Sequence, residues 1–497
     1  MTAGAARWVM ISLFAALIGG LLQIALYPDA DQLDSGYHFL FARWSWHHPE
    51  YLLSVWGRPL FTLIYSFPAQ FGYGATRIFT LLISLLTGHQ TWRLARQLGL
   101  GRAHLAIPLL LAQPVFWQLS TGVYTESLFA LFLVVALRLR QGGWNRTALL
   151  TVATLILIRP EGLFIGLFWG VWHLASALGS SRPGDRVCRG WRIVTATVET
   201  LLLASGMAIW VAAAWLLTGD PLWIVHNWPP DWNPNSQANG TGPIWWYGLL
   251  LPLITGPFTL PAFISGLRNG WRQIHLPATG LFLTIFIVHS ILYSRGWFGA
   301  AGYARYFVCV APVTALIALT GWPETRSARA AGWLERRWRG LLLAGLLFSL
   351  LHVDVLPHGR DSGAIRDLHL EFSRSPVTST LPIDRLICSQ PMMRIVFERD
   401  HWEMPGLTAD RHHNLELIRQ LPAGTLVFWD ARTGPDWYRL TATDFIEAGF
   451  EPLLSREYLL TGRLLPIRKV GTLGARQQTL HLLYRRAGTD QPTPPAD

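Results

Sequence analysis

The residues most able to do chemistry lie inside or beside long apolar segments, where a charged group is costly and usually has a function. Asp34 follows the first apolar segment, and Glu126 begins another in the run GVYTESLFALFLVVAL. Arg159 and Glu161 interrupt a third run, TLILIRPEGLFIGLFWG, and Arg305 lies at the start of ARYFVCVAP. A carboxylate can take a proton from a nucleophile, and a guanidinium can bind a phosphate through paired hydrogen bonds. These residue types indicate chemistry on a lipid-linked substrate at a membrane surface.

The acidic candidates each have a structural alternative. Asp34 directly precedes a helix predicted to start near Ser35, so it could be an N-cap, a general base, or both. Asp29 and Asp31 lie in the same loop and are flexible-loop acids by default. Glu126 falls in the first turn of a helix, where the helix dipole favours an acid. Because a long apolar run follows it, we expect Glu126 to face a polar cavity and to take part in catalysis.

The basic candidates lie where the apolar pattern breaks. Arg159 and Glu161 flank a proline, and a helix break of this kind is tolerated in a membrane only where protein or water surrounds it. Arg159 could bind a donor phosphate, with Glu161 as a substrate-binding residue, or it could form an internal ion pair with Glu161 or Glu126. Arg305 and the nearby Tyr306 are a second phosphate-binding candidate, and the alternative for Arg305 is an arginine that reaches the membrane interface.

Other loop residues are weaker candidates. Arg58 and His226 are predicted to bind substrate from outer loops. His226 opens the run HNWPPDWNPN, whose tryptophans could stack on sugar rings or could simply belong to the membrane interface. His47 and His48 could ligate a metal together with Asp34, but no His-x₃-His or Cys-x₂-Cys spacing supports a dedicated site. A divalent cation as cofactor therefore stays an open alternative.

The composition is that of a membrane protein. Of the 497 residues, 51% are hydrophobic and only 14% are charged, against about 25% in soluble domains, and the mean hydropathy is +0.29. Recurrent apolar runs of about 20 residues predict a polytopic α-helical membrane protein with about eleven transmembrane helices. The predicted spans are 8–27, 75–95, 104–119, 122–138, 147–158, 161–178, 193–218, 245–267, 276–294, 305–321 and 340–355.

Two segments of the N-terminal region are apolar but are not predicted to cross the membrane. Tyr37, Leu40, Phe41 and Trp44 share one face of a helix, and this spacing predicts a helix that lies flat at the membrane surface. The piece Leu60–Phe71 contains a proline and is too short to span, so it is predicted to be a re-entrant or interfacial leg.

Arginines fall mainly in every second loop between the predicted spans. With the N-terminus inside, the loops at 93–102, 138–146, 182–192 and 326–339 are all inside, which is the positive-inside pattern. The net charge of +11 is therefore distributed as in a membrane protein and does not indicate a nucleic-acid partner. The same topology, in a cytoplasmic (inner) membrane, places all the acidic and basic candidates on the outer face.

The composition changes after about Val355. Residues 1–355 are predicted to form a transmembrane catalytic domain, 356–487 a small extracytoplasmic α/β domain, and 488–497 a disordered tail. The cysteines at 188, 309 and 388 fall in different compartments, which excludes a disulfide framework. The predicted strands are Arg385–Ser389, Arg394–Phe397, Gly424–Asp430, Leu465–Val470 and Thr479–Arg485, and the predicted helices are Asp410–Leu421 and Thr443–Gly449.

The order of these motifs resembles the GT-C membrane glycosyltransferases, in particular the polyprenyl-phosphate-sugar-dependent and mannosyltransferase-like members. The resemblance rests on DQLDSGYHFLFAR, GRPLFTLIYSF and TWRLARQLG, followed by GVYTESLFALFLVVAL, LILIRPEGL and GYARYFVCVAPV, and it covers residues 8–320. It implies inverting transfer of a sugar from a polyprenyl-phosphate donor to a glycan, lipid or protein acceptor at the outer membrane face.

The resemblance also implies roles for individual residues. An acid of the first outer loop is catalytic in that family, which corresponds to Asp34, and an acid of the second outer loop, here Glu126, assists. Arginines near later outer loops neutralise the donor phosphate, which suits Arg159 and Arg305. The sequence departs from the family pattern because Asp34 has no adjacent acid, so the choice among the three acids of this loop and the metal dependence stay open.

A polytopic transporter or lipid flippase is the alternative function. Such proteins are expected to carry inverted repeats and charges near the middle of the membrane. Neither is visible in this sequence, and the one-sided placement of the ionisable residues favours an enzyme.

Overall fold

The computed structural model describes residues 3–28, 33–179, 186–229, 232, 240–270, 277–322, 328–355, 360–404, 406–460 and 476–486. These residues form two compact units. The first, here called the membrane unit, contains the described parts of Met1–Leu26 and Ser45–Val355. The second, here called the α/β unit, contains those of Tyr27–Trp44, Leu356–Pro466 and Gly471–Asp497.

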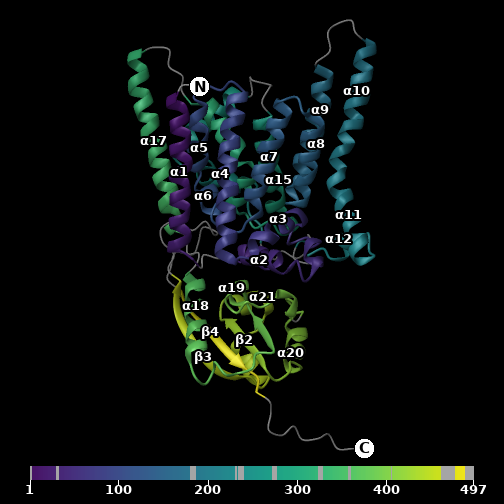
Figure 1. Ribbon diagram of the computed structural model, residues 1–497, viewed down its shortest axis with the longest axis vertical. Helices are drawn as coiled ribbons and strands as arrows, with labels where there is room; N and C mark the ends of the chain where they lie inside the picture. The colour runs from purple at the N-terminus through teal and green to yellow at the C-terminus, as the bar shows by residue number, and fades with distance from the viewer. Residues whose placement is uncertain are drawn as a thin grey trace, which may run out of the picture. The chain divides into compact units, whose positions relative to one another are not determined.

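The membrane unit is a bundle whose long helices lie side by side along one common direction (Figure 1). Helix α4 packs on α7, α7 on α8, and α9 on α10. The helices are α1 (Ala3–Leu26), α3 (Pro59–Ala69), α4 (Tyr73–Gln97), α5 (Ala106–Leu111), α6 (Pro114–Leu119), α7 (Thr125–Gln141), α8 (Asn145–Ala153), α9 (Glu161–Gly179), α10 (Arg186–Thr200), α11 (Ser205–Thr218), α12 (Trp223–His226), α13 (Trp246–Thr255), α14 (Leu260–Gly270), α15 (Ala278–Arg295), α16 (Ala311–Thr320) and α17 (Ala328–Val355), with 3-10 segments η1 (Pro49–Leu52), η3 (Thr154–Leu157) and η7 (Ala304–Val310) among them.

The length and hydropathy of these helices agree with a multi-pass membrane protein. Among the described residues, four helices are long and apolar enough to cross a membrane, and α13 with α14 makes a fifth if the bent pair is one span. The predicted re-entrant leg forms α3, one of several shorter apolar helices. The four long helices are Gly4–Leu26, Glu161–Gly179, Gly190–Thr218 and Ala278–Arg295.

Proline and glycine interrupt two segments that were predicted to be single spans. The segment 104–119 is divided into α5 and α6, and Pro114 is the first residue of α6. The segment 245–267 is divided into α13 and α14, which are bent by 108° relative to each other. Gly256 at this bend has φ +87°, and a Cβ there would lie only 2.3 Å from the carbonyl oxygen of Ala112. Glycine is required at this position because the backbone is left-handed and another chain segment approaches it.

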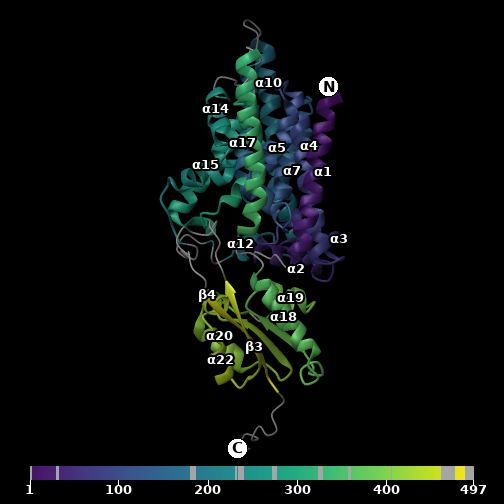
Figure 2. The ribbon, with the colours of Figure 1, turned by 90° about the vertical axis from the view of Figure 1, so that its left-hand side faces the viewer.

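The α/β unit contains a four-stranded sheet with strand order β1-β2-β4-β3. Strand β1 is parallel to β2, and β4 is antiparallel to both β2 and β3. Every residue of β2 is buried because helices cover both faces of the sheet, α18 and α19 on one and α20 and α22 on the other (Figure 2). The elements are α18 (Arg360–Arg374), β1 (Arg385–Cys388), α19 (Pro391–Val396), η8 (His401–Glu403), α20 (Arg411–Arg419), β2 (Thr425–Asp430), α21 (Thr433–Tyr438), α22 (Ala442–Glu447), β3 (Glu451–Leu460) and β4 (Arg476–Tyr484).

Most predicted elements of this unit are confirmed, but one is wrong. The predicted strand Arg394–Phe397 lies largely in helix α19. Pro391 starts that helix because its fixed φ suits the first helical turn and its missing N–H is not needed there. The predicted strand Leu465–Val470 lies outside the described residues. Helix α18 and strand β3 were not predicted.

Helix α2 (Asp34–Trp44) also belongs to the α/β unit. The ring of Tyr37 meets the ring of His401 edge-on at 5.2 Å, and Phe41 meets the same ring at 5.7 Å. The Tyr37 hydroxyl is hydrogen-bonded to Tyr438. The helix predicted after the first span is therefore confirmed, with Asp34 as its first residue, whereas its location at the membrane surface stays a prediction.

Candidate active site

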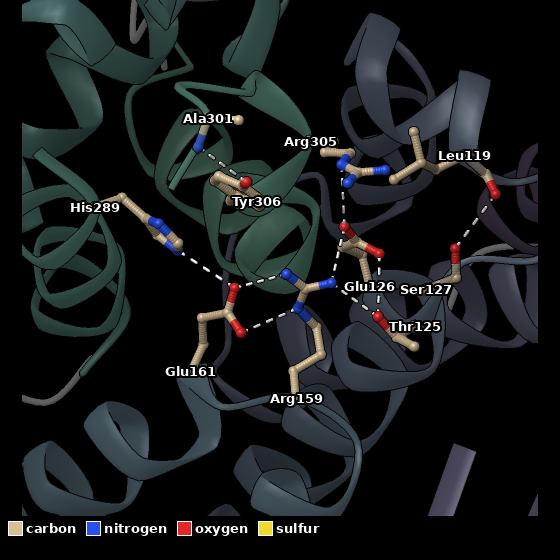
Figure 3. Close-up of polar contacts among 10 residues, drawn as sticks. All are labelled: Leu119, Thr125, Glu126, Ser127, Arg159, Glu161, His289, Ala301, Arg305 and Tyr306. Carbon is tan, nitrogen blue, oxygen red and sulfur yellow. Dashed lines mark hydrogen bonds and ion pairs between the residues drawn. The ribbon is translucent and has the colours of Figure 1, made fainter. Parts of the chain in front are cut away.

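Arg159 is the centre of a buried polar cluster in the membrane unit (Figure 3). It donates from Nε and Nη2 to the two carboxylate oxygens of Glu161, at 3.1 and 2.7 Å. Its Nη1 lies 2.9 Å from Glu126 Oε1 and donates to the Thr125 hydroxyl at 2.8 Å. One guanidinium thus joins two carboxylates, and the ion pairs that the sequence left as alternatives to phosphate binding are both present.

The backbone around Arg159 explains why these groups meet. The 3-10 turn η3 ends just before Arg159, and helix α9 starts at Glu161 on the other side of the proline. A Cβ on Gly162 would lie 2.3 Å from the backbone nitrogen of Ile156, so only glycine allows the chain to turn back this tightly. Glu126 and Glu161 therefore occupy the first turns of α7 and α9, where the helix dipoles favour acids.

Arg305, on η7, is the second cation of the cluster. Its Nε lies 3.8 Å from Glu126 Oε1, a longer ion pair than any made by Arg159. Its guanidinium carbon lies 5.0 Å from the ring centre of Tyr303, 5.6 Å from that of Tyr124 and 6.0 Å from that of Tyr306. The Arg305 side chain is 17% exposed, against 9% for Arg159. Arg305 is therefore the more accessible of the two cations.

His289 is a member of the cluster that sequence reasoning missed. Its Nε2 lies 3.4 Å from Glu161 Oε1, and its ring stacks on Tyr306 with centroids 4.5 Å apart. The Tyr306 hydroxyl accepts a hydrogen bond from the amide of Ala301 at 3.4 Å. The signal was available, because His289 is an ionisable residue within a predicted span and such residues are functional candidates by default.

Comparison with solved structures identifies the fold. No family model matches the sequence, and the search of curated proteins finds no match. A crystal structure of ArnT from Cupriavidus metallidurans in the apo state matches with a TM-score of 0.61 at 13% identity, covering 96% of this chain and 98% of that one. The same protein bound to undecaprenyl phosphate matches with a TM-score of 0.62 at 14% identity, covering 97% and 98%. This chain has the ArnT fold.

The predicted fold class, a polytopic α-helical membrane protein with a small C-terminal α/β domain, is therefore confirmed. The ArnT fold extends over nearly the whole of both chains, including the small mixed sheet at the C-terminus. A multi-pass membrane protein with a C-terminal α/β unit is therefore the established architecture here.

Two predicted site residues of the membrane unit contact groups outside the buried polar cluster, and a third belongs to the α/β unit. Arg58, buried and with φ +69°, has its guanidinium carbon 4.8 Å from the ring centre of Trp232. His226 is exposed, and its Nδ1 lies 2.7 Å from Asp220 Oδ2. Asp34 belongs to the α/β unit.

The metal site and the roles of Asp29 and Asp31 remain predictions. Asp29 and Asp31 lie outside the described residues. Among the part of the chain that the structure describes, no group of three or more His, Cys, Asp and Glu side chains is arranged to hold a metal ion.

Proposed function

We propose that this chain is a membrane glycosyltransferase that transfers a sugar from a polyprenyl-phosphate donor to an acceptor at the extracytoplasmic face. The observation that carries the proposal is that candidates from three separate segments of the sequence meet in one buried cluster, which contains Glu126, Arg159, Glu161, Arg305 and Tyr306. The ArnT fold supports it, and one ArnT structure is bound to undecaprenyl phosphate.

The reaction needs little from the protein beyond a base and a cation. An acceptor hydroxyl oxygen attacks the anomeric carbon, and the bond from that carbon to the phosphate oxygen breaks. Its electron pair leaves with the lipid phosphate, and the hydroxyl proton passes to a carboxylate. A single displacement of this kind inverts the anomeric configuration. No general acid is required, because the lipid phosphate is a stable anion, but a cation at the leaving oxygens lowers the barrier.

Arg305 is the proposed phosphate ligand. Arg159 is held by two carboxylates, so moving it onto a phosphate would leave buried acids without partners. The Arg305 side chain is more exposed than that of Arg159 and its contact with Glu126 is longer, so a phosphate can reach Arg305 at lower cost. The Tyr306 hydroxyl lies in the same cluster and can donate a hydrogen bond to a phosphate oxygen. Arg159, Glu126 and Glu161 then hold the site in shape.

Asp34 is the proposed base. Glu126 and Glu161 are buried and both are ion-paired with Arg159, so neither carboxylate is well placed to meet an acceptor hydroxyl. Asp34 is half-buried at the first turn of α2, and the first-loop position is the one that the family resemblance implies for the base. Asp29 and Asp31 of the same loop are the competing candidates.

Binding of undecaprenyl phosphate to the purified full chain in detergent tests the phosphate site. Arg305→Ala should weaken binding, measured by the shift in melting temperature, by at least tenfold, since a charge-assisted contact to phosphate is lost. Arg295→Ala is the matched control, because Arg295 is an exposed arginine at the end of α15, and it should bind like the unchanged protein. Equal binding by the two variants would reject Arg305 as the ligand.

Release of undecaprenyl phosphate tests the reaction. The reconstituted protein is incubated with a total membrane lipid extract and a panel of undecaprenyl-phosphate-linked pentoses, hexoses and amino sugars, and the freed lipid phosphate is measured by mass spectrometry. Asp34→Asn should reduce release by at least a hundredfold, and Asp31→Asn should not. If labelled donor crosses sealed vesicles with no release, the flippase alternative is favoured instead.

A further inference from the structure

Helix α2 comes from the first loop of the chain, yet it packs within the α/β unit. The segments on both sides of it, up to Leu26 and from Ser45, belong to the membrane unit. Within the α/β unit, α2 contacts helix α19 and the 3-10 turn η8. The C-terminal unit therefore holds a short piece of the first loop, and that piece starts with Asp34, the proposed base.

The contacts of α2 lie at the carboxyl ends of the two parallel strands. Strands β1 and β2 end side by side, since the amide of Ser389 donates to the carbonyl of Phe428 at 3.2 Å. The hydroxyls of Tyr37 and Tyr438 both lie near the thiol of Cys388, the last residue of β1. Helix α2 is therefore in contact with this edge of the sheet.

The chain leaves these two strands towards opposite faces of the sheet. Helix α19 follows β1 and packs on one face through Met392 and Met393. Helix α21 follows β2, and its Tyr438 packs on the other face against Trp429. Open α/β sheets bind their ligands at such a topological switch point, outside the carboxyl ends of the strands. In this unit the group that reaches the switch point is Tyr37, a residue of α2.

We propose that the α/β unit holds α2 and thereby fixes the position of the proposed base Asp34, with Tyr438 and His401 as positioning residues. The ring of His401 contacts those of Tyr37 and Phe41 at 5.2 and 5.7 Å. The Tyr37 hydroxyl donates a hydrogen bond to that of Tyr438. Because Tyr37 lies about one helical turn after Asp34, these contacts also fix the first turn of the helix. The inference rests on the proposed function only where it assigns a role to Asp34.

Hydrogen exchange of the α2 amides in the purified full chain tests whether the unit holds the helix. Tyr438→Phe removes the hydroxyl that accepts from Tyr37 and should speed this exchange about fivefold, since one hydrogen bond is lost. Tyr484→Phe is the matched control, because it removes a tyrosine hydroxyl of the same unit that donates to the carbonyl of Pro382 at 2.9 Å. It should leave the α2 amides unchanged. Combining Tyr37→Phe with Tyr438→Phe should speed exchange no more than either change alone, because all three variants lack the same hydrogen bond.

The rate of undecaprenyl-phosphate release tests whether holding α2 matters for the reaction. Tyr438→Phe should lower this rate about tenfold and leave the affinity for undecaprenyl phosphate unchanged, because a displaced base slows proton transfer without altering the phosphate ligand. His401→Ala removes the ring that both Tyr37 and Phe41 contact, and it should lower the rate further. His401→Phe keeps a ring at this position and should retain most of the rate. A change that only loosened the fold would alter affinity and rate together.

The outcomes separate this inference from the proposed function. No release by the unchanged protein with any donor would reject the proposed function, and exchange of the α2 amides would still decide whether the α/β unit holds the helix. Unchanged exchange in both Tyr438→Phe and His401→Ala would overturn the inference. So would faster exchange with an unchanged rate of release in an assay where Asp34→Asn lowers that rate. Release that Asp34→Asn does not slow would reject Asp34 as the base, and with it the positioning role of the α/β unit.

Discussion

Arg159 in the membrane unit and Arg394 in the α/β unit are both buried, yet their charges are compensated in different ways. Arg159 lies between the carboxylates of Glu126 and Glu161. Arg394 is fully buried and donates to the backbone carbonyls of Leu386 and Asp400. Among the described residues, no carboxylate side chain forms an ion pair with Arg394.

The difference shows what each unit requires of a buried cation. Carbonyls accept hydrogen bonds from Nη1 and Nη2 of Arg394, but its buried Nε has no hydrogen-bond partner among the described residues. The carbonyls also leave the full charge of Arg394 in place, and the pKa of a nearby histidine responds to that charge. Burial, together with the positive charge of Arg394, lowers the pKa of His401 to about 3. In the membrane unit, the two carboxylates of Glu126 and Glu161 balance the two guanidinium charges of Arg159 and Arg305, and Arg159 makes the shorter contacts with them. Arg394 is thus held by backbone groups of the α/β unit, whereas Arg159 is held by side-chain charges of the membrane unit.

The largest expected effect is the loss of stability when Arg159 is replaced. Arg159→Met should remove the shortest ion pairs of two buried carboxylates, Glu126 and Glu161, and lower the free energy of unfolding by about 3–5 kcal/mol. Melting of the detergent-solubilised chain measures this loss. Adding Glu161→Gln to the same variant should restore part of the stability, since one orphaned charge is removed. An unchanged melting temperature in Arg159→Met would mean that the carboxylates do not depend on this arginine.

Parts of this comparison could be predicted from the sequence. Arg159 and Glu161 are two residues apart around a proline, so their pairing was visible as an alternative, and Glu126 was named as a second partner. His289 comes from a helix far along the chain, and no local pattern brings it to Glu161. The choice between ion pair and phosphate ligand also could not be made from the sequence, because it depends on which arginine each carboxylate reaches.

The α/β unit shows a different limit of the sequence. Strand β2 was predicted correctly because its continuous apolar run TLVFWD is typical of a central strand. The segment around Arg394 was predicted to be a strand because its apolar neighbours are β-branched and aromatic, whereas tertiary packing of α19 against the sheet makes it helical. Strand β3 was missed because the register shift near Pro452 breaks the alternation of its apolar residues.

Arg394→Met should have the next largest effect. It removes the donors to two buried carbonyls and should cost about 2–3 kcal/mol, less than the loss of Arg159, because carbonyls are neutral and a buried unpaired carbonyl costs less than a buried unpaired carboxylate. Hydrogen exchange of the β1 and β2 amides in the full chain would report the loss locally. If the β1 and β2 amides in Arg394→Met lost as much protection as is expected when a buried carboxylate loses its partner, the backbone carbonyls would not be the principal partners of Arg394.

Glu126→Gln sharpens the assignment of roles within the cluster. Removing this negative charge 3.8 Å from Arg305 should increase the affinity for undecaprenyl phosphate about fivefold. If Glu126 only holds the arginines, the rate of sugar transfer should fall less than tenfold. A loss of more than a hundredfold with unchanged lipid binding would instead assign Glu126 a direct part in proton transfer.

The smallest expected effect is a loss of stability at low pH, which depends on His401 and on the positive charge of Arg394. Because the pKa of His401 is about 3 when folded and about 6.5 when unfolded, the unfolded chain binds the extra proton between these values. The contribution to stability is therefore complete above pH 6.5 and decreases as the pH falls toward 3. After a discount for partial solvent screening, about 1 kcal/mol should be lost at pH 5.5.

His401→Phe keeps an aromatic ring against Tyr37 and Phe41 but cannot titrate, so the protection of α2 and β1 amides should change less between pH 7.5 and 5.5 than in the unchanged protein. Arg394→Met should reduce the same pH dependence, because removing the cation lets the pKa of His401 rise toward its ordinary value. A pH dependence that persisted in both variants would place the responsible proton elsewhere. It would also mean that the positive charge of Arg394 has no effect on the titration of His401.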